Sequence, residues 1–166
     1  MQKILLSLVF SLFLITSTSY AFAQMTITEV EDPVVILETS QGEIIIEFFY
    51  LDAPIHAKNF ILLTENGNYD GTLFHRIIPG FMIQSGDPNS ISGDPNTWGQ
   101  GGNGILSDKI DAEFNNIKHD RGIVSMARAQ DPNSAGSQFF IVHKDSHFLD
   151  EQYTVFGRIV TESSFE

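Results

Sequence analysis

An arginine lies among apolar and amide side chains in the middle of the chain. Arg76 follows Phe74 and precedes Met82 and Gln84, and a second group of the same kind lies at residues 138–140. On strands, alternation would place Arg76 on the face of Phe74, and Met82 on the face of Gln84. A charged donor beside an apolar hollow could bind a ligand, but spacing alone favours a hydrophobic core with one arginine whose charge reaches solvent.

Other common catalytic arrangements are missing from the sequence. It has no cysteine, no G-x-S-x-G and no H-E-x-x-H motif, which removes the obvious covalent and zinc-protease routes. His143 and His147 have a spacing that suits a metal on a helix, but no third ligand is well placed, so we interpret them as surface or packing residues. The glycine-rich residues 99–104 lack the Lys and Ser/Thr of a phosphate loop. We therefore expect no metal and no nucleotide cofactor.

The elements that must position these side chains begin with a hairpin and a helix. Residues 34–37 and 43–49 are β-rich and are separated by a Ser-Gln-Gly turn. Asp52 as a cap and Pro54 in the first turn predict a helix that ends at Gly67 and covers the sheet with its apolar side.

Short strands and loops make up the rest of the chain. A segment rich in Gly, Asn, Asp and Pro at residues 87–116 predicts a long functional or mobile loop. Five further strands are expected at residues 73–77, 81–85, 122–127, 138–142 and 154–159. Many short strands with one clear helix favour a mainly β barrel or sandwich.

Composition limits the possible partners. The 166 residues are 42% apolar and include 14 Phe, which is enough to fold one domain. Lys and Arg total 9 against 21 Asp and Glu, a formal net charge of -12. Nucleic acid and anionic lipid are therefore poor partners.

The first 23 residues have the pattern of a secretory signal. Lys3 precedes an apolar run at residues 4–15, and an A-x-A site ends at Ala23. We expect cleavage after Ala23, then an acidic lead-in at residues 24–33 and a working domain at residues 34–166. No Asn-x-Ser/Thr sequon points to a glycosylated eukaryotic product, and we favour a prokaryotic protein exported to the periplasm or the exterior. Because cysteine is absent, stability must come from the core rather than from disulfides.

Three ordered blocks of sequence carry a family resemblance. They are FHRIIPGFMIQSGD at residues 74–87, GIVSMA at 122–127 and GSQFFI at 136–141. Together they closely resemble the cyclophilin family of peptidyl-prolyl cis-trans isomerases, and the likeness runs from about Val34 to the chain end. The resemblance implies an eight-stranded antiparallel β-barrel flanked by helices.

The resemblance also implies roles for individual residues. Arg76 is implied as the catalytic guanidinium. The proline pocket is implied to be lined by Phe81, Met82, Phe140 and Leu149. Gln84 and Gln138 are implied to form hydrogen bonds with the bound peptide. The backbone at Ala127 and Arg128 is implied to run beside it. Three positions differ from many family members, with Phe148 in place of Trp, Tyr153 in place of His and Arg128 in place of Asn; the first two keep an aromatic wall.

Family members usually continue beyond the position of Glu166 into a further helix and a strand that closes the barrel. We therefore expect this last helix and closing strand to be missing from this chain, as in a fragment. The implied partners are proline-containing polypeptides, and we expect a monomer that is attached to a membrane only if the signal segment is retained. Two alternatives stay open: a module that binds proline-containing segments without turnover, and a structural or surface interaction protein.

Overall fold

A computed structural model of the chain describes residues 33–160, and the fold is that of these residues. The predicted signal segment, nearly all of the acidic lead-in and residues 161–166 lie outside them. Between residues 33 and 160, no helix is long and apolar enough to cross a membrane.

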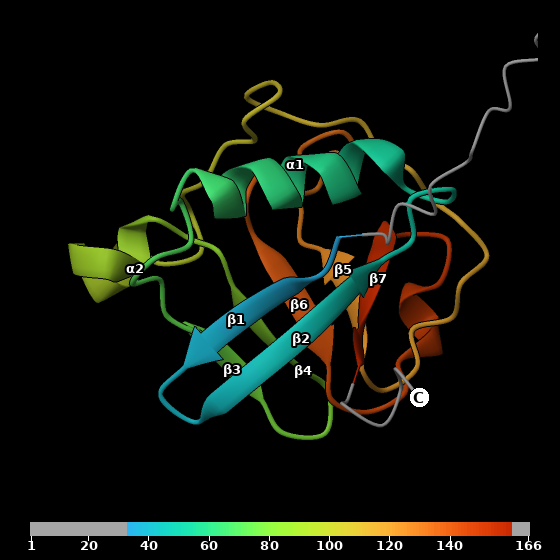
Figure 1. Cartoon of the computed structure of the whole chain (residues 1–166), viewed down its shortest axis with the longest axis horizontal. Helices are drawn as coiled ribbons and strands as arrows, with labels where there is room; N and C mark the ends of the chain where they lie inside the picture. The colour runs from blue at the N-terminus through green and yellow to red at the C-terminus, as the bar shows by residue number, and fades with distance from the viewer. Residues whose placement is uncertain (1–32, 161–166) are drawn as a thin grey trace, which may run out of the picture. The chain divides into compact units, whose positions relative to one another are not determined.

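Seven antiparallel strands form one sheet. In chain order they are β1 (Val35–Thr39), β2 (Gly42–Phe48), β3 (Arg76–Ile78), β4 (Met82–Ser85), β5 (Ile123–Met126), β6 (Phe139–Val142) and β7 (Val155–Val160). Their order in the sheet is β1-β2-β7-β5-β6-β4-β3, and the sheet curls into a half-barrel (Figure 1). The predicted mainly β, antiparallel architecture is confirmed, although within residues 33–160 no pairing joins the edge strands β1 and β3.

The predicted hairpin is formed by β1 and β2. Val35 pairs with Ile46 and Thr39 pairs with Gly42 across a two-residue turn. The Thr39 hydroxyl accepts a hydrogen bond from the Gln41 amide at 3.1 Å and donates one to the Gly42 carbonyl at 2.6 Å. Gly42 has a φ of 122°, a conformation that favours glycine, so the turn chemistry fixes the register.

Helix α1 (Pro54–Glu65) begins with Pro54, as predicted, but the predicted cap is wrong. The residue at the cap position is Ala53, and no side chain next to it caps the helix. The carboxylate of Glu113, far along the chain, instead accepts hydrogen bonds from the amides of Ile55 at 3.0 Å and His56 at 2.9 Å. A distant loop therefore satisfies the free N–H groups of the first turn.

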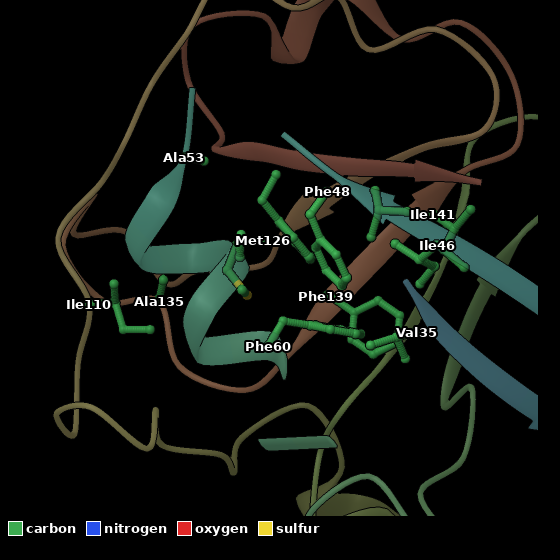
Figure 2. Packing of buried hydrophobic residues seen from close by; sticks show 13 residues of the cluster. Val35, Ile46, Phe48, Ala53, Phe60, Ile110, Met126, Ala135, Phe139 and Ile141 are labelled. Atoms are coloured by element: carbon green, nitrogen blue, oxygen red, sulfur yellow. The ribbon is translucent and has the colours of Figure 1, made fainter. Parts of the chain in front are cut away.

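The main hydrophobic core lies between α1 and the sheet. Phe60 from the helix is fully buried and meets Phe139 edge-on, with ring centroids 5.0 Å apart. Phe156 also packs against Phe60, with ring centroids 5.3 Å apart. Figure 2 shows Phe60 and Phe139 converging with Phe48 and Ile46 between the helix and the strands. We call this cluster the helix-side core.

Strand β6 separates the helix-side core from a second apolar cluster. Phe139 and Ile141 belong to the helix-side core, whereas Phe140 and Val142 belong to the second cluster with Met82. Successive side chains of a strand point to opposite faces, so four consecutive apolar residues supply two interiors. The second cluster forms the base of the candidate site described below.

The strand that carries Arg76 is shorter than predicted. β3 begins at Arg76 rather than at Leu73, so the alternation argument does not extend back to Phe74. Phe74 packs against the helix-side core, with its ring 6.4 Å from that of Phe139. The prediction that Arg76 and Phe74 face the same way is therefore wrong, and this leaves the Arg76 guanidinium free to border the other cluster.

The segment at residues 87–116, which we call the glycine-rich segment, includes two short helices, α2 (Asn89–Ser92) and the 3-10 helix η1 (Pro95–Thr97). Asn59 of α1 anchors the segment, because its side chain accepts from the Ile105 amide at 2.9 Å and donates to the Gly136 carbonyl at 3.0 Å. A Cβ atom at Gly136 would lie 2.5 Å from the Gly102 carbonyl oxygen. The segment therefore packs closely against the chain before β6.

Candidate active site

A surface pocket lies over the second apolar cluster. It is a cavity of about 250 Å³, which we call the proline pocket. Its lining residues come from four strands or their ends and from the 3-10 helix η2 (His147–Leu149) and its flank: Arg76, Phe81, Met82, Gln84, Ala127, Arg128, Phe140, Phe148, Leu149 and Tyr153. The structure thus brings together every residue predicted for the site except Gln138, which lines the adjoining cavity.

A chain of hydrogen bonds fixes the polar edge of this pocket. The Arg76 guanidinium donates to Gln84 Oε1 at 3.3 Å, and Gln84 Nε2 donates to Gln138 Oε1 at 2.9 Å. Gln138 Nε2 donates in turn to the Gly101 carbonyl at 2.6 Å. Because Arg76 and Gln84 are paired across β3 and β4, the backbone also holds them side by side. The side-chain amides of Gln84 and Gln138 therefore each have a defined orientation. The other N–H groups of the Arg76 guanidinium are left for a ligand.

Aromatic and sulfur-containing side chains form the apolar walls. Met82 is 1% exposed, and Phe140 is almost fully buried at the base. Tyr153 meets Phe140 edge-on, with centroids 5.8 Å apart, and Phe81 lies 5.4 Å from Phe148. Phe148 is 67% exposed, so it forms an open rim rather than part of the core. The pocket suits a small apolar ring.

Arg128 has a structural task at the same rim. Its guanidinium donates two hydrogen bonds to the Gln152 carbonyl, at 2.9 and 3.1 Å, and a third to the Ala129 carbonyl at 2.9 Å. Its central carbon lies 4.6 Å from the centre of the Tyr153 ring. The side chain therefore ties the end of β5 to the segment before β7, in addition to bordering the pocket.

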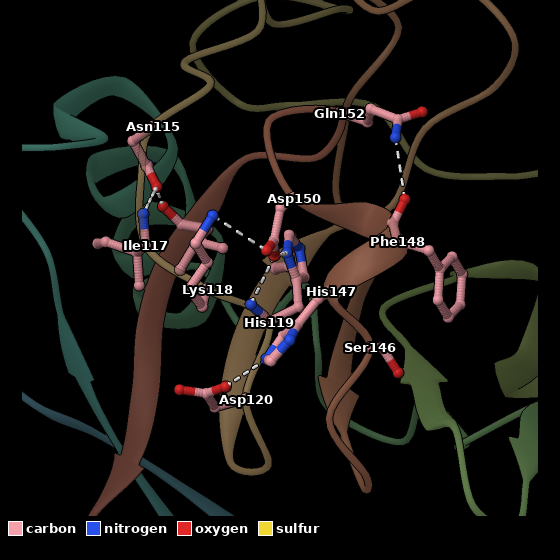
Figure 3. A network of polar contacts seen from close by, with 12 residues as sticks. Asn115, Ile117, Lys118, His119, Asp120, Ser146, His147, Phe148, Asp150 and Gln152 are labelled. Atoms are coloured by element: carbon pink, nitrogen blue, oxygen red, sulfur yellow. Dashed lines mark hydrogen bonds and ion pairs between the residues drawn. The ribbon is translucent and has the colours of Figure 1, made fainter.

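A buried polar network supports the base of the pocket and was missed by sequence reasoning. The imidazole of His119 lies parallel to the Phe140 ring, at 13° and 6.1 Å between centroids. Its Nδ1 lies 3.0 Å from Asp150 Oδ1 and its Nε2 lies 3.1 Å from the Ser125 hydroxyl. Figure 3 shows His119 beside Asp150, and Asp150 Oδ2 also forms an ion pair with Lys118 Nζ at 3.3 Å. His119 and Asp150 are 31 residues apart, so spacing gives no sign of this contact.

The network has an Asp-His-Ser order, yet it is not a nucleophilic site. Ser125 is completely buried, and its hydroxyl donates to the Thr154 carbonyl at 2.9 Å. A nucleophile must reach a substrate, and this oxygen does not reach the surface. The three residues position Phe140 and hold η2 instead.

The electrostatics of the network follow from burial and hydrogen bonding. Burial lowers the pKa of His119 and outweighs the hydrogen bond to Asp150, which would raise it. For Asp150, burial acts to raise the pKa, but the hydrogen bonds from His119 and Lys118 prevail and lower it to about 2. The carboxylate is thus ionised across the physiological range and keeps η2 in place.

The two histidines considered for a metal have separate partners. His143 Nδ1 accepts from the Gly80 amide at 3.1 Å, next to the turn between β3 and β4. His147 Nε2 lies 2.7 Å from Asp120 Oδ1, and that hydrogen bond raises the pKa of His147. Asp145 also lies near this pair, and all three are exposed. The pair His143 and His147 thus does not form a shared ligand set.

A second cavity of about 150 Å³ adjoins the proline pocket, and we call it the side pocket. The two share Gln84, Ala127 and Arg128. The rest of the side pocket is lined mainly by the glycine-rich loop and the segment before β6: Gly99, Gln100, Gly101, Gly102, Lys109, Ala129, Ser134, Gly136 and Gln138. Because they share Gln84, Ala127 and Arg128, the two cavities are contiguous.

Comparison with known proteins agrees with this geometry. Residues 34–166 match the family described as cyclophilin type peptidyl-prolyl cis-trans isomerase/CLD. The chain is 47% identical over 128 residues to peptidyl-prolyl cis-trans isomerase-like 3 of Rhizopus delemar, covering 76% of this chain and 74% of that protein. It is 44% identical over 127 residues to peptidyl-prolyl cis-trans isomerase ppi1 of Schizosaccharomyces pombe, covering 75% of this chain and 77% of that protein.

Solved structures give the same result. A Cryptosporidium parvum cyclophilin type peptidyl-prolyl cis-trans isomerase, crystallised in the presence of the dipeptide Ala-Pro, superposes with a TM-score of 0.71 at 37% identity. The match covers 80% of this chain and 81% of that chain. The fold, the sequence match and the relatives agree, and the chain therefore belongs to the cyclophilin-type peptidyl-prolyl cis-trans isomerases.

Proposed function

We propose that this isomerase accelerates rotation about X-Pro bonds in exported polypeptides, with Arg76 stabilising the twisted amide. The observation that carries the proposal is the position of the Arg76 guanidinium at the edge of an apolar pocket, held by Gln84. The solved relative crystallised in the presence of Ala-Pro supports a small X-Pro segment as the ligand. The proline ring would enter between Met82 and Phe140.

The reaction requires no bond to break. Rotation about an X-Pro bond meets a barrier of about 20 kcal/mol, because the C–N bond has partial double-bond character. In the twisted state the proline nitrogen becomes pyramidal and regains its lone pair. A donor near that nitrogen, or near the displaced carbonyl oxygen, binds this state more tightly than either ground state and so lowers the barrier. Arginine suits this role because it stays charged and presents several N–H groups in one plane.

The hydrogen bond alone is too weak for efficient catalysis. An acceleration of about 10⁵ corresponds to about 7 kcal/mol, whereas one hydrogen bond from a charged group contributes roughly 1.5–3 kcal/mol. The remainder would come from the apolar walls, which hold the pyrrolidine ring while the preceding residue turns. Exclusion of water around Phe140 and Met82 would also strengthen the arginine contact.

The experiment is exchange spectroscopy on an Ala-Pro peptide with and without the protein. The wild type is expected to accelerate cis-trans exchange, and Arg76→Ala is expected to abolish most of the acceleration while the peptide still binds. Arg76→Lys keeps the charge but loses the planar donor set, so only partial activity should return. Peptide binding without exchange in the wild type would favour a binding module. The proposal would be overturned if the wild type showed no binding and no exchange.

Export is the second part of the proposal. It rests on the signal-like pattern of Lys3, the apolar residues 4–15 and Ala23. We place the processed protein in the periplasm or the exterior of a prokaryotic cell, as a monomer that is membrane-attached only if the signal segment is retained. N-terminal sequencing of the exported protein should find Gln24 first, and light scattering should give the monomer mass. Recovery with Met1 intact in the soluble cell interior would refute export.

A further inference from the structure

Positive charge gathers around the two pockets of a chain that is otherwise strongly acidic. Among residues 33–160, Asp and Glu outnumber Lys and Arg by two to one. Even so, the residues that line the two pockets include Arg76, Lys109 and Arg128 and, among the described residues, no Asp or Glu. The charged side chains that line the two pockets are therefore all positive, although the protein as a whole is negative.

The side pocket lies within reach of residues next to the proline. It shares Gln84, Ala127 and Arg128 with the proline pocket, so the two cavities are contiguous. An extended chain advances about 3.3–3.6 Å per residue. The side chain of a residue up to about three positions from the proline would therefore lie over the side pocket.

Lys109 is the cation there that is least occupied by the protein. It is exposed, and its Nζ lies 3.5 Å from Asn103 Oδ1, at the limit of a hydrogen bond. The Arg128 guanidinium, by contrast, is engaged with backbone carbonyls, so it contributes charge more than free donors. Lys109 can therefore turn toward a ligand.

Several carboxylates lie close to Lys109 in the chain or beneath the loop. Asp108 and Asp111 are its near neighbours in sequence but do not line the pocket. Asp87 lies buried under the glycine-rich loop, where its two oxygens accept backbone hydrogen bonds from Asn89 and Gly99. None of these three carboxylates lines either pocket, whereas Arg76, Lys109 and Arg128 do, and the Asp87 carboxylate is already engaged by backbone N–H groups.

We propose that Lys109, assisted by Arg128, makes the enzyme select proline-containing segments with an acidic residue within three positions of the proline. Lys109 is thus a specificity-determining residue. The proposal rests on the proposed isomerase site and adds a substrate class to it. It opposes what the net charge of -12 alone predicts, since the whole-molecule charge favours basic peptides.

The test uses capped alanine peptides with one proline and with Glu, Gln or Lys placed one to three positions before or after it. For each peptide, the dissociation constant is read from an NMR titration and the exchange rate from the same sample. At the best position the wild type should bind the Glu peptide roughly three- to fivefold more tightly than the Gln peptide, and the Lys peptide more weakly. The preference should shrink as salt is raised from about 0.05 to 0.5 M.

Two charge-reversing variants separate the local effect from the net charge. Lys109→Glu should reverse the order of the Glu and Lys peptides. Lys58→Glu is the matched control, because Lys58 is exposed on α1, outside both pockets, and the change in net charge is the same. Equal binding of the three peptides at every position, or equal effects of the two variants, would overturn the proposal. Loss of exchange with all peptides but an intact Glu preference in binding would refute the isomerase mechanism and leave the charge selection supported.

Discussion

The Arg76 guanidinium donates to Gln84 Oε1 at 3.3 Å, and the two residues are also opposite each other in the β3–β4 pairing. Backbone and side chain thus restrict the guanidinium together. This arrangement limits the rotamer freedom that a long arginine would otherwise lose on binding a substrate. Preorganisation of the donor is the property that an electrostatic role in catalysis requires.

Gln84→Leu should weaken catalysis more than it weakens folding. The substitution removes the acceptor of Arg76 and the donor to Gln138 but keeps a side chain of similar size. Loss of one such hydrogen bond contributes roughly 0.5–1.5 kcal/mol, so kcat/KM should fall about two- to tenfold. Gln138→Leu, one step further from Arg76, should have a smaller effect on kcat. An equal effect of both variants on kcat would contradict the direct role of Gln84 in holding Arg76.

Phe148→Ala should reduce substrate affinity without reducing stability. Phe148 is 67% exposed and contacts Phe81 at the rim of the proline pocket. Exposed substitutions change the free energy of unfolding by roughly 0.5 kcal/mol or less, so KM should rise while the urea midpoint stays constant. Leu51→Ala is the control, because Leu51 is 98% exposed and lies outside the pocket. It should change neither quantity.

Glu113→Ala should destabilise the fold although it lies outside the site. The carboxylate accepts from the amides of Ile55 and His56 and lies 2.7 Å from His56 Nδ1. Removing it leaves the first turn of α1 without these partners, and we expect a loss of about 2–3 kcal/mol in urea unfolding. Glu65→Ala, an exposed change at the other end of α1, should have little effect. A stable Glu113→Ala variant would show that water replaces the carboxylate without cost.

The free energy of unfolding should fall as the pH is lowered below about 6.5. Burial lowers the pKa of both His56 and His119 in the folded state, so the unfolded chain takes up protons first. Their contribution is complete above the unfolded value of 6.5 and is lost as the pH falls through the folded values. The exposed His147, whose pKa is raised by Asp120, acts in the opposite direction. Asp150 adds a further loss between pH 3.8 and about 2.

Urea titrations at about pH 7.5, 6.5, 5.5 and 4.5, which span the ordinary histidine pKa, would measure how the free energy of unfolding changes with pH. His119→Gln should have a shallower slope than the wild type. A free energy of unfolding that stays constant over the series would contradict the assignment.

Turnover should depend much less on pH than stability does. The proposed mechanism uses the charge of Arg76 and no proton transfer, so kcat/KM should be nearly constant between about pH 6 and 8. Exchange spectroscopy on the Ala-Pro peptide across that range would check this. A bell-shaped profile would indicate general acid-base catalysis and would contradict the mechanism.

Local patterns predicted most of the fold, whereas long-range contacts escaped the sequence. The hairpin turn around Gly42 and the start of α1 at Pro54 depend on nearby residues, and both were predicted. The cap by Glu113 joins residues 58 apart, and the support of the pocket by His119 and Asp150 joins residues 31 apart. Such pairs depend on the closed fold, so periodicity and propensity carry no information about them.

The site shows the same division. Spacing alone favoured a packed core around Arg76, and only the resemblance to a family implied that Phe140 and Leu149 would join it. The structure places these residues around one cavity because β6 and η2 meet there. Lys109 was not singled out in the sequence, since its importance comes from the signs of the charges around the cavity.

The division of β6 between two interiors has a practical consequence for engineering. Positions 140 and 142 face the second cluster and positions 139 and 141 face the helix-side core. A library that varies only the even positions can reshape the ligand cavity while the odd positions keep the scaffold folded. A register shift of one residue in this strand would exchange the two sets of side chains. A single insertion beside the strand is therefore more damaging than several point changes within it.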